Sequence, residues 1–401
     1  MNIVLFDDPS VRTELFPFTL TRPVANIRCG IMTIDEKWSK RLDADVSFLT
    51  SEYLQKKFPL KETDDNVLIN GSLCPDEDIV NAIRSLKPGQ SIAKENLILA
   101  SRQSSASVPT IDKSSISYSN PVTLIDRVWK IFDLNAAQIK ADLPVITKGR
   151  KSAGINDKHT AVYGEENLFV EEGVTVRAAI INAERGPVYL GKNSIVHEGA
   201  VIRGAFSLGE GSEINPGAKV RGDTSIGPHC KAGGEIAATV MFGYSNKSHD
   251  GYMGCSVVGE WCNFGADSNT SNLKNNYDTV KLWNHNKKAF LDTGLQFCGL
   301  IMGDHSKCGI NSMFNTGTMV DVFANVYGAD FLPNYIPSFS WGGSGGLTTY
   351  TFEKAMQTAR KVLERRGLTL DEIDFDILQT VYKLTAEQRH WENRSGQQKT
   401  V

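Results

Sequence analysis

His249 is the residue of this sequence whose chemistry is easiest to interpret. It lies in the polar segment FGYSNKSHDGY (242–252). A histidine imidazole titrates near neutral pH, so such a side chain can accept a proton from a reacting group as a general base. A histidine in a polar segment can equally be an ordinary surface residue. The residue type alone leaves both interpretations open.

The segment around His249 interrupts a repeat with a period of six residues. From Leu190 onward an aliphatic residue begins seven successive hexads: Leu190, Val196, Ile202, Leu208, Ile214, Val220 and Ile226. The fifth residue of each hexad is small, except for Phe206. An aliphatic residue that fills the interior and a small residue at the corner build one flat side of a three-sided coil. The repeat predicts a left-handed parallel β-helix over residues 166–340.

The hexad phase returns at Val258 and Phe264, and again from Met302. Residues 270–300, between these blocks, are rich in Asn and Lys and have no such phase. In a solenoid an insertion leaves the coil as an external loop, often on the binding face. We therefore predict an external loop over 270–300.

The chain on either side of the coil has other patterns. Strand-like runs at 2–6, 45–50, 66–70 and 96–100 alternate with helical patterns, which predicts an α/β, Rossmann-like domain with a mostly parallel sheet over 1–145. A further helix is predicted at about 123–140. Residues 146–165 are predicted as a linker. The glycine-rich WGGSGG (341–346) predicts a flexible hinge, and 347–401 a C-terminal helical segment.

Composition narrows the classes of protein. The 401 residues carry 43 Lys+Arg against 46 Asp+Glu, a net charge of -3, which argues against a nucleic-acid-binding protein. No apolar run is long enough for a membrane span, and the opening MNIVLFDDPS does not resemble a secretory signal. Seven cysteines without a C-x-x-C pair fit reduced thiols. We expect a cytoplasmic protein that contacts neither nucleic acid nor membrane.

Two sets of motifs resemble known transferases. The block KSHDGYMGCSVVGEWCNFGADS (247–268), followed by NNYD (275–278), is similar to the acetyltransferase part of the bifunctional enzymes that make UDP-N-acetylglucosamine. Over nearly its full length the chain resembles the GlmU-like family of sugar nucleotidyltransferases, through FDDP, FTLTRPVANIR, ITKGRKS and TGLQFCGLIMGDHSKCGIN. The resemblance implies a nucleotidyltransferase-like domain fused to an N-acetyltransferase that acts on an amino-sugar phosphate with acetyl-CoA, yielding a nucleotide sugar.

The resemblance to the acetyltransferases also implies roles for particular residues. His249 would be the catalytic base, and Glu235 would orient its imidazole or hold the amine. Arg221 would bind the sugar phosphate, because a guanidinium can hold two phosphate oxygens at once. The remaining implied roles are sugar or phosphate binding by Tyr252, Asn263, Asn276 and Tyr277, and contact with the acetyl-CoA arm by Ala266 and Thr293. Ala237 departs from the family, which has a lysine there, so the acceptor could differ from glucosamine-1-phosphate.

In the N-terminal domain the nucleotidyltransferase pattern is incomplete. Arg12 and Arg22 match its nucleotide-binding cations, but the expected loop has no glycine, and the metal-binding Asp of an N-G-D triplet is replaced by Ser72. Such enzymes use Mg²⁺, for which Asp7, Asp8 and Asp76 are substitute ligands, so the metal site stays undefined. Three interpretations follow for this domain: nucleotidyl transfer with an altered loop, sugar-nucleotide binding without turnover, or a scaffold.

Two other functions are compatible with a β-helix. β-Helical carbonic anhydrases bind zinc through three histidines, two of them five residues apart. The seven histidines here include no such pair, so zinc hydration is disfavoured. A purely structural role, as a trimeric scaffold or sugar-binding module, remains an alternative. Because three-sided coils commonly pack in threes, we expect a homotrimer in either case.

Overall fold

The computed structural model describes residues 2–112 and 115–392, which form two compact units. Of the described residues, the first unit comprises those from 2 to 28 and from 32 to 128, and the second comprises residues 29–31 and 129–392. The helical residues that follow 128, predicted to end the first domain, are grouped with the coil. Within the described residues, no helix is long and apolar enough to cross a membrane.

The N-terminal unit is built on a mixed six-stranded sheet, with the strand order β2-β1-β3-β6-β5-β7. Its strands are β1 (Asn2–Phe6), β2 (Val46–Leu49), β3 (Asn66–Asn70), β5 (Ser91–Lys94), β6 (Leu97–Gln103) and β7 (Ile116–Ser117). β1 pairs in parallel with β2 and β3, whereas β6 is antiparallel to both β3 and β5. The prediction of a mostly parallel sheet was therefore wrong for the half that contains β6. The reason is that residues 91–103 form a hairpin.

Helices and a small ribbon complete this unit. They are α1 (Pro9–Glu14), α2 (Ile34–Leu42), α3 (Glu77–Arg84), and the antiparallel pair β4 (Leu73–Cys74) and β8 (Thr123–Leu124). Thr33 and Glu36 form the capping box expected from the sequence, which satisfies backbone N–H groups at the start of α2. Val4, Phe6 and Leu68 from the central strands are fully buried.

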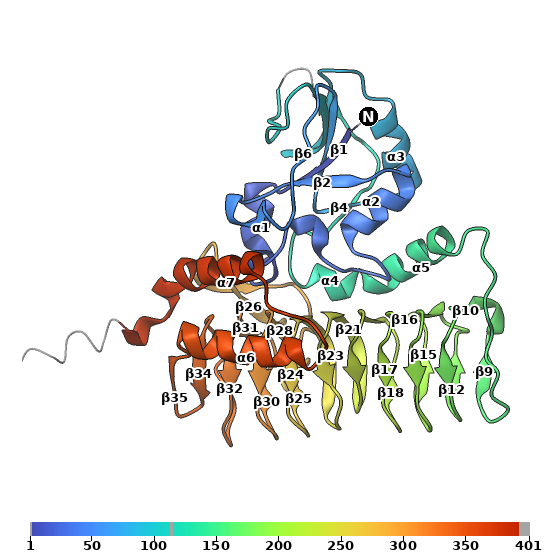
Figure 1. Cartoon of the computed structure of the whole chain (residues 1–401), viewed down its shortest axis with the longest axis vertical. Helices are drawn as coiled ribbons and strands as arrows, with labels where there is room; N and C mark the ends of the chain where they lie inside the picture. Colours follow the sequence, from blue (N-terminus) through green and yellow to red (C-terminus); the bar gives the residue numbers. More distant parts are fainter. Residues whose placement is uncertain (1, 113–114, 393–401) are drawn as a thin grey trace, which may run out of the picture. The chain divides into compact units, whose positions relative to one another are not determined.

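The second unit is a parallel β-helix, whose coils follow one another side by side in Figure 1, and its strands form three faces. The first face consists of β10 (Leu168–Val170), β13 (Val188–Leu190), β16 (Phe206–Leu208), β19 (Thr224–Ile226), the second halves of β21 (Glu235–Gly243) and β23 (Tyr252–Glu260), β28 (Ile301–Met302), β31 (Met319–Val320) and β33 (Tyr335–Ile336). The second face consists of β11 (Thr175–Val176), β14 (Ile195–Val196), β17 (Glu213–Ile214), β20 (Lys231–Ala232), β22 (Asn246–Lys247), β24 (Asn263–Phe264), β29 (Lys307–Cys308), β32 (Asn325–Val326) and β34 (Ser340–Gly343). The third face consists of β9 (Ala161–Tyr163), β12 (Ile180–Asn182), β15 (Val201–Arg203), β18 (Lys219–Val220), the first halves of β21 and β23, β25 (Asn269–Thr270) and β30 (Met313–Phe314).

The hexad interpretation is confirmed at each of its interior positions. All seven aliphatic residues from Leu190 to Ile226 are at most 2% exposed, and they belong to one apolar core that runs along the coil. Burying each of these side chains is worth roughly 1.5–3 kcal/mol, so the repeat supplies much of the energy that holds the coils together. The predicted fold class is confirmed: an α/β domain, a parallel β-helix and C-terminal helices.

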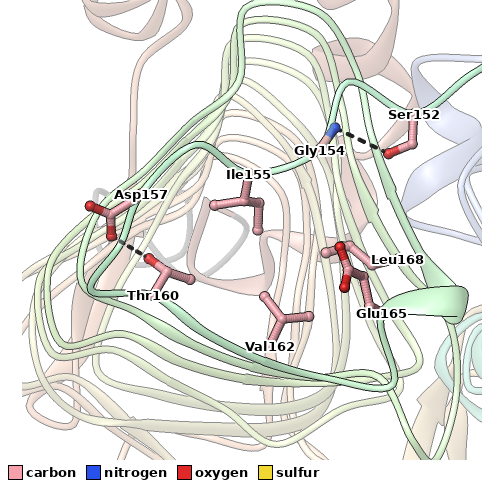
Figure 2. A pocket seen from close by; sticks show the side chains of 8 residues that line it. All are labelled: Ser152, Gly154, Ile155, Asp157, Thr160, Val162, Glu165 and Leu168. Atoms are coloured by element: carbon pink, nitrogen blue, oxygen red, sulfur yellow. Dashed lines mark hydrogen bonds between the residues drawn. The ribbon is translucent and has the colours of Figure 1, made fainter.

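Residues 151–160 close the open end of the coil before its first strand. Figure 2 shows Ile155 directed into the triangular interior, where it packs against the apolar core. The hydroxyl of Thr160 donates to the Asp157 carboxylate at 2.6 Å, and the same carboxylate accepts from the N–H of Ala178 at 2.8 Å. These bonds lower the pKa of Asp157. Residues 152–168 line a cavity of about 490 Å³ at this end of the coil.

Helices cover parts of the coil. α4 (Lys130–Asp133) and α5 (Asn135–Ile146) pack on the first face, where the Asn135 side chain bonds both Asp223 and Ser225 at 3.0 Å. The helix predicted at 123–140 thus begins and ends later. α6 (Phe352–Glu364) runs along the coil (Figure 1), and α7 (Glu372–Leu384) packs on α6. The predicted hinge WGGSGG is instead a hairpin between β34 and β35 (Gly346–Thr349).

The candidate acyl-transfer site

Three of the predicted site residues lie together on the third face of the coil. Glu235 begins β21 and Tyr252 begins β23, and the two are directly in register on neighbouring strands. Arg221 follows β18, and its Nη1 lies 3.1 Å from Oε1 of Glu235. Tyr252 is half-buried, which raises its pKa, and its hydroxyl accepts a hydrogen bond from the Asn272 amide at 3.1 Å. The coil therefore presents a cation, a carboxylate and a phenol side by side.

His249 lies at the corner between the second and third faces, in residues 248–251, hereafter the His249 corner. Its side chain is exposed. Side chains of Asn215 and Lys247 fix the backbone of this corner. The Asn215 amide donates to the Ser248 carbonyl at 2.8 Å, and the ammonium of Lys247 donates to the His249 carbonyl at 2.7 Å. The corner leads directly into Tyr252, so His249 lies at the edge of the coil where β21 and β23 begin with Glu235 and Tyr252.

Lys247 is a residue whose role the sequence did not reveal. It is in register with the interior residue Ala232, and its side chain is only 1% exposed. Its ammonium donates to three backbone carbonyls, of Gly233, His249 and Asp250. Burial lowers its pKa to about 8. The signal was present in the hexad pattern, because a lysine stands where neighbouring coils have an apolar residue.

The next coil carries Asn263 and Ala266. Asn263 is exposed on the second face, in register with Asn246 of β22, and thus lies on the other side of the His249 corner from Tyr252. Ala266 occupies the following corner, where its carbonyl accepts from the N–H of Asn311 at 2.8 Å. These two residues lie near the same edge of the coil but belong to different faces from the Arg221 group.

Residues 271–300 leave the coil, and part of this segment folds back onto it. β26 (Lys281–Asn284) and β27 (Ala289–Asp292) form an antiparallel hairpin. Trp283 stacks on Tyr335 of the first face at 4.3 Å between ring centroids. Nε2 of His285 lies 3.1 Å from the fully buried carboxylate of Asp321. The hairpin is therefore attached to the first face, not to the face that carries Arg221.

The predicted loop residues lie near the base of this hairpin. The side chain of Asn276 bonds the carboxylate of Asp278, and Tyr277 is 67% exposed with its carbonyl bonded by Gln296 at 3.0 Å. The hydroxyl of Thr293 donates to the Val280 carbonyl at 2.8 Å and accepts from Leu295. Among the hydrogen bonds found within residues 2–112 and 115–392, none joins these three residues to the Arg221 group.

The predicted nucleotide-binding arginines are buried inside the N-terminal unit. Nη1 of Arg12 bonds the Asp7 carboxylate at 2.8 Å, and Nη2 bonds the Tyr53 hydroxyl at 2.9 Å and the Thr19 carbonyl. Burial raises the pKa of Asp7 even though Arg12 lies beside it. Arg22 is 4% exposed, and its carbonyl also accepts from Arg12. Both guanidinium groups are thus enclosed by the protein's own residues.

The substitute metal ligands are also engaged internally. Asp8 caps α1, Asp76 caps α3, and the hydroxyl of Ser72 bonds the Asn70 side chain at 2.8 Å. No group of three or more His, Cys, Asp or Glu side chains within the described part of the chain could hold a metal ion.

Comparisons with known proteins agree with the resemblance predicted from the sequence. Residues 3–151 match the model of a sugar nucleotidyl transferase family. The bifunctional protein GlmU of Methanocaldococcus jannaschii is 35% identical over 86 residues, which cover 21% of this chain and 20% of that protein. A bifunctional sugar-1-phosphate nucleotidylyltransferase/acetyltransferase of Sulfurisphaera tokodaii is 30% identical over 93 residues, or 23% of each chain. The aligned segments thus span only about a fifth of these relatives.

Among solved structures, the polySia-specific acetyltransferase NeuO matches 49% of this chain and 85% of its own, at 12% identity and a TM-score of 0.28. The sequence matches are the more informative comparisons. They confirm that the chain resembles bifunctional nucleotidylyltransferase/acetyltransferases, with residues 3–151 matching the sugar nucleotidyl transferase family.

Proposed function

We propose that the coil is an N-acyltransferase that moves the acetyl group of acetyl-CoA to the amine of an amino-sugar phosphate. The observation that carries this proposal is the row of Arg221, Glu235 and Tyr252 on adjacent strands, which ends beside the exposed His249. The row offers a cation for a phosphate, hydrogen-bonding groups for a sugar, and a base for an amine. The similarity to nucleotidylyltransferase/acetyltransferases supports the same reaction class.

In the proposed reaction, the amine nitrogen attacks the carbonyl carbon of the thioester while the imidazole of His249 accepts the amine proton. A nitrogen–carbon bond forms, the carbon–sulfur bond breaks, and the leaving thiolate takes the proton from the imidazolium. The products are the N-acetylated sugar phosphate and free CoA. Backbone N–H groups at a turn of the coil would stabilise the oxyanion that forms during the attack.

The other predicted site residues keep their proposed roles. Arg221 would hold the phosphate, and Glu235 would orient the amine or the imidazole. Tyr252 and Asn263 would bind the sugar from the two faces that meet at the His249 corner. Ala266 and Thr293 would lie along the acetyl-CoA arm, with the methyl group of Thr293 as the contacting part, because its hydroxyl is bonded within the hairpin.

We also propose that the protein is a homotrimer. The exposed position of the His249 corner and of Tyr277 supports this arrangement, because both are accessible to a second copy of the chain. Asn276 and Tyr277 would then complete the site of a neighbouring protomer. Light scattering should give three times the chain mass of 44.1 kDa, and a mass of a single chain would exclude the arrangement.

A second candidate activity is sugar-1-phosphate nucleotidyl transfer by the N-terminal unit, with Mg²⁺ as the metal. The match of residues 3–151 to a sugar nucleotidyl transferase family favours it. The internal bonds of Arg12 favour the alternative in which this unit is a scaffold, since that guanidinium would have to leave Asp7 before it could hold the phosphate of any nucleotide. We propose a cytoplasmic location, in keeping with seven free cysteines.

One screen distinguishes these functions. The full chain is incubated with a nucleoside triphosphate and a sugar-1-phosphate, with and without acetyl-CoA and Mg²⁺, and the products are identified by mass spectrometry. A product that gains an acetyl group only when acetyl-CoA is present supports acyl transfer. A nucleotide sugar that appears only with Mg²⁺ supports nucleotidyl transfer. No product with any amino sugar would overturn the acyl-transfer proposal.

A further inference from the structure

A cavity of about 540 Å³ lies between the second face of the coil and the carboxyl end of α6. Its volume is within the range of small-molecule sites. The walls come from β20, β22, β24 and β29 on one side and from residues 362–366 on the other. Ser248 and Asn263 also line it, so the cavity opens beside the His249 corner.

The lining of this cavity is strongly cationic. It includes Lys231, Lys307, Arg365 and Arg366, and no Asp or Glu is among the residues that line it. Three of the four cations have polar partners that hold them in place, and those of Lys307 are backbone carbonyls. Nζ of Lys231 lies 3.0 Å from Oε1 of Glu213, and Nη2 of Arg366 donates to Oδ1 of Asn246 at 3.1 Å. Because Lys231 is paired with Glu213, the positive charge of the cavity comes mainly from Lys307, Arg365 and Arg366. These cations repel one another, and an anion bound among them would relieve that repulsion.

Lys307 is the most enclosed of these cations. Its ammonium donates to two backbone carbonyls, of His305 at 3.0 Å and Trp261 at 3.3 Å. Burial lowers its pKa to about 8, so at pH 7 the group is still charged while it lies largely out of water. Carbonyl oxygens offset part of the cost of burying a charge, and a bound anion would offset more.

Two aromatic residues, Tyr244 and Trp261, also line the cavity, and they belong to a longer stack of rings. Tyr244 and Trp261 stack at 4.3 Å between centroids, His229 lies 4.9 Å beyond Tyr244, and His305 lies 6.2 Å beyond Trp261. Because both faces of the Tyr244 and Trp261 rings are covered in this way, the cavity meets their edges. Ring edges carry partial positive charge and therefore suit an anion rather than a stacked base.

We propose that this cavity binds the phosphate groups of a phosphorylated small molecule, most simply a pyrophosphate. Arg365, Arg366 and Lys307 would contact the phosphate oxygens, and Lys231 would add charge at the rim. Coenzyme A and nucleotide sugars both carry a pyrophosphate, so either could be the source of this group. His249 does not line the cavity, so binding here would not require acyl transfer to occur.

Isothermal titration of the full chain at low salt tests the proposal, with inorganic pyrophosphate, coenzyme A and UDP-N-acetylglucosamine as separate probes. We expect pyrophosphate to bind, and Arg365→Ala to weaken its binding about tenfold, because a charge-assisted hydrogen bond would be lost. Lys361→Ala is the matched control, since Lys361 is an exposed cation of the same helix that does not line the cavity. The variant Lys361→Ala should bind pyrophosphate with the affinity of the wild type.

Because Arg365 is exposed, its replacement by Ala should leave the fold intact. A second variant, Lys307→Met, tests the contribution of the enclosed cation. Tighter binding of coenzyme A or of the nucleotide sugar than of pyrophosphate would identify the source of the phosphate group. The proposal is overturned if no probe binds, or if Lys361→Ala weakens binding as much as Arg365→Ala, which would indicate general attraction to charge. Neither result depends on whether the protein acetylates a sugar.

Discussion

The ammonium of Lys247 donates a hydrogen bond of 2.7 Å to the backbone carbonyl of His249. The lysine side chain lies inside the coil, in register with Ala232, and also bonds the carbonyls of Gly233 and Asp250. Three carbonyls around one ammonium fix the His249 corner from the interior, while the imidazole itself faces outward. Lys247 is thus a positioning residue for the proposed base.

The lowered pKa of Lys247 makes the stability of the protein depend on pH in a specific way. The folded protein loses this proton at about pH 8, whereas an unfolded lysine keeps it until about pH 10.4. Between these values the unfolded state binds more protons, so the contribution of Lys247 to the free energy of unfolding rises with pH, by up to about 3 kcal/mol.

Denaturant unfolding at several pH values checks this prediction. Buried cysteines and tyrosines titrate in the same range, so the quantity to compare is the difference between wild type and Lys247→Met. The wild type should gain stability relative to the variant as pH rises from 8 to 10. A difference that stays constant with pH would show that Lys247 is not buried as described.

Arg221 is predicted to select for a phosphorylated acceptor. Replacing Arg221 by Ala removes a guanidinium that would make charge-assisted bonds to the phosphate, worth about 1.5–3 kcal/mol. We expect kcat/KM to fall at least tenfold for an amino-sugar phosphate and to change little for the same sugar without phosphate. Arg203→Ala, at an exposed position of the same face, provides the control. Equal losses on both substrates would assign Arg221 a structural role.

Arg12 is predicted to stabilise the N-terminal unit. Arg12→Met leaves the carboxylate of Asp7 buried without its cation, which should lower the free energy of unfolding by about 3–5 kcal/mol. The exposed Arg84→Met should change it by no more than about 0.5 kcal/mol. The double variant Asp7→Asn/Arg12→Met should recover part of the loss. If Arg12→Met is as stable as wild type and instead weakens nucleotide binding, the arginine serves a ligand after all.

Binding of phosphate in the cavity between the second face of the coil and the end of α6 should weaken as pH rises through about 8. Lys307 loses its charge there because burial lowers its pKa, so one of four lining cations disappears. The affinity for coenzyme A should therefore be higher at pH 7 than at pH 9, and the decrease should be smaller in Lys307→Met, which has no such charge to lose. Titration calorimetry of both proteins at the two pH values measures this. The same pH dependence in both proteins would place the titrating group elsewhere.

The coil was predictable from the sequence because its interior repeats. Each hexad places its first residue in the interior, so an aliphatic residue recurs at Leu190, Val196 and onward. Seven such matches in succession would not arise from ordinary alternation of apolar and polar residues. The same pattern marks Lys247 as an exception, without explaining it. A lysine at an interior position contradicts the pattern, and only the three carbonyls that receive its ammonium explain how it is accommodated.

Irregular parts of the chain were less predictable. The glycines of WGGSGG were interpreted as a flexible hinge, but a hairpin turn requires glycine as well, and β34 pairs with β35 through Gly343 and Gly346. Residues 91–103 show one clear strand in sequence and two in the structure, since the turn at Glu95 and Asn96 lacks the glycine that usually marks a hairpin.

The candidate site was predictable only in part. The motif resemblance named Glu235 and Tyr252, but only the structure shows that they lie in register on neighbouring strands. Motif resemblance could not show which way the guanidinium of Arg12 points. Its partners are the carbonyl of Thr19 and the side chains of Asp7 and Tyr53, and such contacts between distant residues are determined by tertiary packing.

The most direct test of the account is acetylation of glucosamine-1-phosphate and related amino-sugar phosphates by wild type, His249→Ala and His197→Ala, followed by release of free CoA thiol. His197 lies at the same edge of the coil, in the corner between β14 and β15, and provides a matched control. We predict that His249→Ala loses activity about 10²–10⁴-fold without loss of folding, and that His197→Ala keeps it. Full activity in His249→Ala would contradict the proposed site.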